Sequence, residues 1–263
     1  MINIETFKKT INGRPVVICL GGKSIEELNQ FIESFRNENI CWIGLNQFEP
    51  AETILAKIDK KMSIVYDSVS TKEELSFVFE EKTRLPRLKE FLSRDKNNIL
   101  ITTHGIVRDV WSKKEHSWFL DTFKDQIFEI DSVFPPEQIG DWMSVPNSAT
   151  LTIAAAYAGG ASKIALLGCD GNAKGISSYY LPEFHIEERA TSIGQIEDLS
   201  INSASLIFEK EIVGLIKRYR ELFNNKAPLV NCSYCTRHLC LPIIYCSSLL
   251  DFLKGNIQPD PTC

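Results

Sequence analysis

Residues that could carry a proton or contact a phosphate occur in an irregular stretch of this 263-residue chain, residues 173–195. This stretch is rich in Gly, Ser, Tyr, His and Glu and contains Tyr179, Tyr180 and His185. Imidazole and phenol groups are common proton carriers in enzymes, and a segment of about 20 residues without periodicity is more typical of a functional loop than of a linker. We therefore expect a lid at residues 173–195, with Tyr179, Tyr180 and His185 as the side chains best suited to handle a proton.

A second set of polar residues follows short apolar runs that are typical of buried strands. Six such runs, bounded by turn residues, predict strands at residues 14–20, 40–45, 62–66, 98–103, 163–167 and 228–231. Because ligands sit outside the carboxyl ends of parallel strands, the residues after these runs are candidates for binding. They are Gly21, Gly22, Lys23, Ser24, Asn46, Gln47, Asp67, Asp170 and Asn172, with Thr102 and Thr103 at the end of the fourth run and His104 directly after it.

Each of these signals also has a plainer explanation. Gly21-Gly22 before a helix is the order of a phosphate-binding turn, but the sequence GGKS fits neither the dinucleotide nor the P-loop motif, and a glycine turn can serve packing alone. Asn46 and Gln47 can donate and accept hydrogen bonds, as recognition of a base or ribose requires, or they can satisfy the loop backbone. The repetition of polar residues at three successive strand ends favours a ligand-binding edge.

The stretch from Pro146 to Asn172 predicts the fold class. Ser148 begins a helix of small apolar residues, Gly159-Gly160 ends it, and a buried strand follows at once. A helix that feeds a buried strand implies a parallel sheet. We therefore expect an α/β, Rossmann-like fold with a mostly parallel sheet flanked by helices, in a single domain over residues 1–263. Ser148 would face the same edge as the strand ends.

Two local expectations concern other helices. Ser24 as N-cap with Glu27 three residues later predicts a capping box. Residues 71–94 are charged and helical in period, and Pro86 is expected to interrupt them.

Net charge and hydropathy limit the classes of protein to which this chain can belong. The formal net charge of −5 at pH 7 argues against binding to nucleic acid, because no basic excess is offered to phosphate backbones. No apolar run approaches the roughly 20 residues that span a bilayer, and the N-terminus lacks a signal-peptide core. We expect a cytoplasmic protein. Peripheral membrane association and a homo-oligomer both stay open.

Two groups of cysteines lead to different expectations. Cys19, Cys41 and Cys169 lie in or beside apolar runs and are expected to be small buried hydrophobes. Four more cysteines with His238 among them could hold zinc or an iron–sulfur cluster, although their spacing fits neither pattern well. These four are Cys232, Cys235, Cys240 and Cys246. Ordinary thiols are therefore the preferred interpretation.

Six segments, taken in order, resemble the single-domain bacterial sialyltransferases and, more broadly, the archaeal 6-hydroxymethylpterin diphosphokinase-like domain. The segments are VVICLGGKSIEEL, GLNQFEP, IVYDS, NSATLTIAAAYAGGASKIALLGCD, ISSYY and LVNCSYCT. The resemblance leaves residues 70–140 unmatched. It implies nucleotide binding by Gly21, Gly22, Asn46, Asp67 and Ser148, and it places Asp170 at the edge of the site and Tyr179 against the leaving phosphate.

The chain also departs from the sialyltransferase pattern. Lys23 adds a cation to the glycine turn, Asn172 stands nearest to the place of a second lid tyrosine, and Gln195 falls where the family has its catalytic histidine. Glutamine cannot take a proton from an acceptor hydroxyl. Either His185 serves as the base from a different position in the lid, or the chain is not a sialyltransferase.

Three hypotheses follow. The first is a transferase that moves a sugar from a nucleotide-sugar donor to a hydroxyl of a saccharide or protein without a metal, with Lys23 and Tyr179 stabilising the phosphate. The second is a diphosphokinase that acts with ATP on a pterin-like small alcohol, with Asp67 and Asp170 holding Mg²⁺. The third is a nucleotide-binding protein that has lost catalysis, which Gln195 supports.

Overall fold

The computed structural model describes residues 1–46, 48–67, 85–114, 116–133, 148–169, 214–233, 244–246 and 248–257. Among the predicted residues, Gln47, Asp170, Asn172, Tyr179 and His185 lie outside these ranges, as does the expected lid. The side chain of Lys23 is likewise not described.

Eight parallel strands form one sheet in the order β5-β4-β3-β2-β1-β6-β7-β8. The strands are β1 (Val16–Cys19), β2 (Cys41–Leu45), β3 (Ile64–Tyr66), β4 (Ile99–Thr102), β5 (Ile127–Glu129), β6 (Ile164–Leu167), β7 (Leu229–Asn231) and β8 (Ile244–Cys246). The chain builds outward from β1 to β5, returns to the other side of β1 with β6, and builds outward again. The strand order therefore reverses between β1 and β6.

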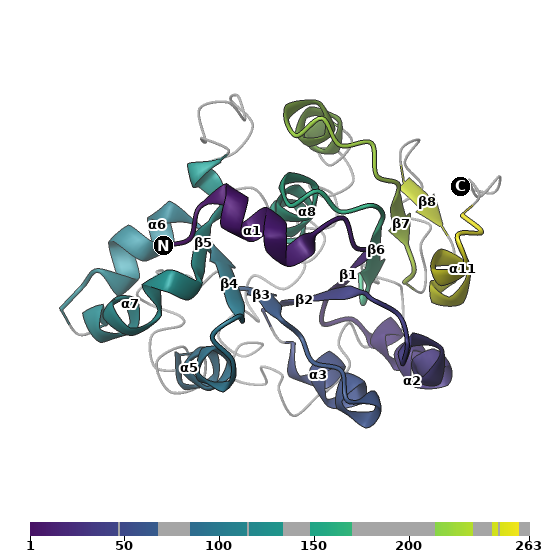
Figure 1. Ribbon diagram of the computed structural model, residues 1–263, viewed down its shortest axis with the longest axis horizontal. Helices are drawn as coiled ribbons and strands as arrows, with labels where there is room; N and C mark the ends of the chain where they lie inside the picture. The colour runs from purple at the N-terminus through teal and green to yellow at the C-terminus, as the bar shows by residue number, and fades with distance from the viewer. Residues whose placement is uncertain are drawn as a thin grey trace, which may run out of the picture.

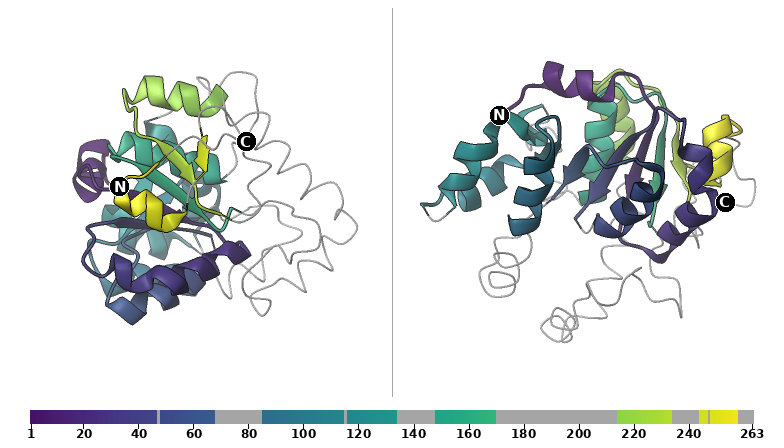
Figure 2. Two further views of the ribbon diagram at one scale, coloured as in Figure 1. Left: turned by 90° about the vertical axis from the view of Figure 1, so that its right-hand side faces the viewer. Right: turned by 60° about the horizontal axis from the view of Figure 1, so that its bottom comes forward.

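Helices cover both faces of this sheet (Figures 1 and 2). One face packs against α1 (Ile4–Ile11), α8 (Ser148–Ala158) and the helical residues 214–222. The other face packs against α2 (Glu27–Phe31), α3 (Glu49–Leu55), α5 (Leu85–Arg94), α7 (Ser117–Phe123) and α11 (Leu249–Lys254). Because right-handed crossovers put the helices of the two directions of winding on opposite faces, the strand order accounts for the helices that connect two strands. α1 precedes β1 and α11 follows β8, so the rule does not apply to these two helices. The α/β Rossmann-like prediction is confirmed.

Helix α8 is apolar on all sides because it is enclosed on all sides. Ten of its eleven residues are buried, among them five alanines that let it approach the sheet and α1 closely. Directly after it, Gly159 lies so close to α1 that an added Cβ would stand 2.2 Å from Cδ1 of Ile11. Gly160 has a φ of 78°, which ends the helix as predicted.

All six predicted strands are present, shortened by one to three residues. The two strands that were not predicted, β5 and β8, are three residues long and lie at the edges of the sheet. The capping box at Ser24 is wrong. Gly22 occupies the N-cap of a 3₁₀ turn (Lys23–Glu26), and the Ser24 hydroxyl bonds elsewhere. Pro86 lies in the first turn of α5, where its missing N–H costs nothing. Residues 71–84, on the other side of the expected interruption, lie outside the described ranges.

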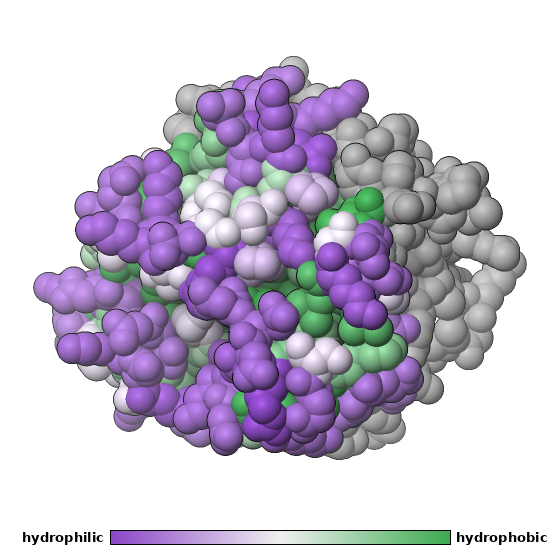
Figure 3. Space-filling model, turned by 45° about the vertical axis from the view of Figure 1, so that its right-hand side comes forward, coloured by the Kyte–Doolittle hydropathy of each residue, from purple (hydrophilic) through white to green (hydrophobic). Residues whose placement is uncertain are grey.

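Burial raises the pKa of two of the cysteine thiols. Cys19 and Cys41 are fully buried, which raises the pKa of the first thiol to about 12 and of the second to about 11, whereas Cys169 is half-buried. Hydrophilic residues cover most of the face in Figure 3, with hydrophobic residues in smaller areas between them. Within the described ranges no helix is both long and apolar enough to cross a bilayer.

Candidate functional site

The reversal between β1 and β6 brings two loops into direct contact at the carboxyl end of the sheet. The N–H of Gly22 donates to the carbonyl of Gly168 over 2.9 Å, and the N–H of Gly168 donates to Oγ of Ser24 over 3.0 Å. Reversal points of this kind form the ligand crevice in open α/β sheets. The predicted glycine turn therefore lies at the expected place in the fold.

The hydrogen bonds at this point give two of the predicted residues a structural role. Ser24 is fully buried, and its hydroxyl holds the loop after β6. The N–H of Gly22 is already used in the same contact. Gly21 is half-buried, and Lys23 begins the 3₁₀ turn next to it. Binding of a phosphate by this turn stays a prediction.

A row of polar residues crosses the neighbouring strand ends. Asn46, Asp67, Thr102 and Glu129 lie one position beyond, or at, the last paired residues of β2, β3, β4 and β5. These four residues lie side by side because the residues before them are in register: Leu45 pairs with Tyr66, Tyr66 with Ile101, and Ile101 with Phe128. Thr102 itself pairs with Glu129. We call these four residues the polar row.

Three members of the polar row lie on the α5 side of the sheet. Tyr66, Ile101 and Phe128 belong to the core under α1 and α8, and the residue after each points to the opposite face because side chains alternate along a strand. Asp67 and Thr102 are fully buried and Glu129 is 8% exposed. Buried polar groups at three adjacent positions are costly unless each has a partner.

Two buried oxygens of the polar row lack such a partner among the described residues: Oδ1 of Asn46 and Oγ1 of Thr102. Asn46 also has a φ of 52°, a left-handed conformation that asparagine tolerates better than most residues. Its backbone thus explains why an asparagine fits this turn. Its free side-chain oxygen has no structural explanation in the described chain and is suited to accept a hydrogen bond from a ligand.

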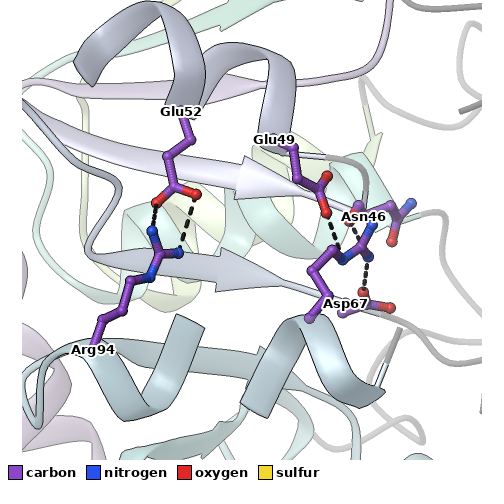
Figure 4. A network of polar contacts seen from close by, with 6 residues as sticks. Asn46, Glu49, Glu52, Asp67 and Arg94 are labelled. Atoms are coloured by element: carbon purple, nitrogen blue, oxygen red, sulfur yellow. Dashed lines mark hydrogen bonds and ion pairs between the residues drawn. The ribbon is translucent and has the colours of Figure 1, made fainter. Parts of the chain in front are cut away.

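Asn46, Glu49 and Asp67 lie around one guanidinium group, which joins the strand ends of β2 and β3 (Figure 4). Arg87 on α5 donates through Nη2 to the carbonyl of Asn46 at 2.7 Å and to Oδ2 of Asp67 at 3.1 Å. Its Nε lies 2.7 Å from Oε1 of Glu49, at the start of α3. The guanidinium also lies over the Phe48 ring, 5.3 Å from its centroid. A single side chain therefore fixes both strand ends and the loop that leads to α3.

Glu49 is the member of this cluster whose ionisation is disfavoured. Burial raises the pKa of Glu49 above its ordinary value of 4.5, and the charge of Arg87 offsets only part of that effect. Asp67 and Glu52 add smaller repulsions in the same direction.

We expect Glu49→Gln to gain stability relative to the native protein as the pH rises from 4.5 to neutral. Above pH 4.5 the unfolded chain loses the Glu49 proton before the folded protein does, so the native protein is destabilised as the pH rises through this window. Urea unfolding of both proteins at a series of pH values measures the difference. The control is Glu33→Gln, because the hydrogen bond from Arg36 lowers the pKa of Glu33, so the native protein gains stability from this group as the pH rises toward 4.5 and the variant should lose stability relative to it in that lower window. Two variants with the same sign would contradict the assignment.

The other face of the sheet places Ser148 beside Tyr66. The side chains of these two residues are hydrogen-bonded, and burial raises the pKa of the Tyr66 hydroxyl well above its usual range. Ser148 is half-buried at the start of α8. It therefore lies at the carboxyl edge, as expected from the helix that begins where a strand ends.

The structure thus brings Gly21, Gly22, Ser24, Asn46, Asp67 and Ser148 to one edge of the sheet. Sequence reasoning missed Arg87 and Glu129. No local pattern marks Arg87, which is one basic residue among many in its segment. Glu129 was missed because β5 was missed.

The described residues do not fit a magnesium site built on Asp67. Its carboxylate is fully buried and already paired with Arg87, whereas Mg²⁺ needs accessible oxygens and retains several waters. No group of three His, Cys, Asp or Glu in the described ranges is arranged to hold a metal ion. Asp170, Cys235 and Cys240 lie outside those ranges.

The strand order and the helices on both faces of the sheet define an α/β protein of the doubly wound, Rossmann-like class. Polar residues are gathered at the carboxyl ends of its strands. No protein-family model, curated protein or solved structure matches the chain. The resemblance to sialyltransferases therefore stays a prediction from the six segments.

Proposed function

We propose that the carboxyl edge of the sheet binds a nucleotide-sugar donor and that the protein transfers the sugar to a hydroxyl of a saccharide or protein. The observation that supports this most is the polar row beside the reversal of strand order. It combines the place where α/β sheets bind ligands with a buried, unpartnered amide oxygen on Asn46.

The chemistry of the edge suits a nucleotide better than an apolar ligand. The amide of Asn46 can both accept from and donate to a base or ribose. The edge from β1 to β4 spans three strand spacings, or about 14 Å at about 4.8 Å each. An extended nucleotide sugar could lie along it with the nucleotide at Gly21 and the sugar beyond Asp67.

Pairing of Asp67 with Arg87 favours metal-free transfer over the diphosphokinase alternative, because the latter needs Asp67 as a magnesium ligand. In the proposed transferase, Lys23 and Tyr179 stabilise the leaving phosphate, and Gln47, Asp170 and Asn172 complete the donor site. A saccharide or protein acceptor approaches the same edge. These assignments rest on the sequence.

Thermal shift tests the proposal. We expect at least one of CMP, UDP and GDP to raise the melting temperature without Mg²⁺, because a ligand that binds only the folded state stabilises it. Asn46→Gly should weaken that nucleotide by about fivefold, the loss of one hydrogen bond of about 1 kcal/mol. Glycine keeps the left-handed backbone at this position, so the change isolates the side chain.

Asn12→Gly is the matched control. Asn12 has a φ of 48° and is exposed at the end of α1, away from the edge. The Asn12→Gly substitution should leave nucleotide binding unchanged. If no nucleotide raises the melting temperature, with or without Mg²⁺, the proposal fails. If ATP with Mg²⁺ alone does so, the diphosphokinase replaces it.

A further inference from the structure

A histidine and a carboxylate form a fixed pair at the end of the polar row. Nδ1 of His104 lies 2.9 Å from Oε2 of Glu129. The backbone N–H of His104 donates to both carboxylate oxygens of Asp131, at 2.7 and 2.9 Å. The main chain and the ring of His104 are thus each held by a separate carboxylate.

The burial of the two side chains is unequal. The His104 side chain is 60% exposed and that of Glu129 is 10% exposed. Because Nδ1 is used by Glu129, Nε2 is the ring nitrogen left for a ligand, and it has no partner among the described residues. An ordinary surface ion pair of this chain looks different: in Lys8–Glu5 both side chains are exposed, at 49% and 71%.

The position of Glu129 in the sheet also distinguishes the His104–Glu129 pair from a surface ion pair. It is the last residue of β5 and stands in register with Thr102, whose buried hydroxyl oxygen has no hydrogen-bond partner among the described residues. A carboxylate that is withdrawn from water and bonded to one ring nitrogen fixes the tautomer and the orientation of the imidazole.

We infer that His104 is the general base of the transfer reaction and that Glu129 positions it. This inference rests on the proposed function. Nε2 of neutral His104 takes the proton of the acceptor hydroxyl while the acceptor oxygen bonds to the anomeric carbon. The bond between that carbon and the donor phosphate oxygen breaks, and the nucleotide leaves with the electron pair. Glu129 stabilises the imidazolium that forms.

The place of His104 in the fold fits this role. It lies two residues beyond the end of β4, three strands from the reversal at β1. A donor whose nucleotide lies at Gly21 and extends across β2 and β3 would present its sugar near β4. The acceptor would then reach the anomeric carbon from the side of β4 and β5, where His104 is exposed. His185 is not needed as the base in this arrangement.

The first test needs no donor and uses diethyl pyrocarbonate, which acylates imidazole, as the probe. Mass spectrometry follows the acylation of His104 at pH 8 in the native protein, Glu129→Gln and Glu52→Gln. We expect Glu129→Gln to slow it about fivefold because the ring loses its carboxylate partner. Glu52→Gln is the matched control, since Glu52 is also a largely buried carboxylate, 15% exposed, in an ion pair with Arg94. Equal rates in native protein and Glu129→Gln would overturn the activated pair.

The second test measures nucleotide release from CMP-N-acetylneuraminic acid, UDP-glucose and GDP-mannose, with lactose or water as acceptor. His104→Gln should lower turnover by about 10²- to 10⁴-fold, and Glu129→Gln by about 10- to 100-fold. Both variants should keep the thermal shift given by the nucleotide, and added imidazole should restore part of the turnover of His104→Ala. A His104→Gln protein that retains a large part of the native turnover overturns the assignment.

The two tests separate the inference from the function on which it rests. If no nucleotide binds and no donor is turned over, the proposed function fails and the role as general base falls with it, while the acylation rates still decide whether the pair is activated. If donors are turned over equally well without His104, the function stands and another group is the base.

Discussion

Replacement of Arg87 by methionine is expected to lower the free energy of unfolding by about 3–5 kcal/mol, the cost of leaving a buried carboxylate without its partner. Asp67 is fully buried and Glu49 is 23% exposed, and both face the same guanidinium. The carbonyl of Asn46 loses its donor as well. Methionine keeps much of the length of the side chain, so the loss reports charge and hydrogen bonds more than volume. Urea unfolding at neutral pH measures it.

Two further variants separate the charge effect from the loss of packing. Arg36→Met removes an arginine whose ion pair with Glu33 is exposed on both sides, at 44% for the arginine and 71% for the glutamate side chain. Its cost should stay near or below about 1 kcal/mol. Arg87→Met combined with Asp67→Asn should recover part of the loss, because the buried charge is removed. Equal costs for the two arginines, or no recovery in the double variant, would show that Arg87 acts only by packing.

The same network explains why the candidate site could be predicted only in part. The strand ends are local features: a short apolar run followed by Asn46 or Asp67 is visible in the sequence. Their alignment in one row is not local, because it depends on the register of β2 to β5. Arg87 reaches the row from a helix that follows residues 68–84, and no spacing rule connects it to Asn46.

The elements that were missed share a physical cause. β5 and β8 have three residues each, as do β3 and β7, which were predicted, so length alone does not explain the omission. What β5 and β8 share is their place at the two edges of the sheet, where each strand is completed by pairing with a single neighbour. Ser24 was assigned to a helix cap because its local sequence fits one. A contact with Gly168, 144 residues away, takes its hydroxyl instead. In each case a tertiary contact decides the outcome, and such contacts are absent from a local pattern.

Gly168→Ala is expected to lower the free energy of unfolding by about 2–5 kcal/mol, the sum of left-handed strain and of overpacking against backbone. Gly168 has a φ of 79°, and an added Cβ would lie 2.4 Å from the carbonyl oxygen of Leu20 and 3.1 Å from the nitrogen of Gly22. No side-chain rotation can relieve contacts with backbone atoms. The loops after β1 and β6 would have to separate, which breaks the hydrogen bond between Gly22 and Gly168.

Gly160→Ala separates these two contributions, because Gly160 has nearly the same φ, 78°, and no atom within 4 Å of an added Cβ. It should cost only the backbone strain, about 1–2 kcal/mol, and urea unfolding of both variants gives the difference. Only Gly168→Ala should also abolish the thermal shift given by a nucleotide, since it moves the glycine turn at the reversal of strand order. If both alanines cost the same and nucleotide binding survives in both, the contact between the two loops has no part in shaping the site, and the edge from Asn46 to His104 must bind the donor without it.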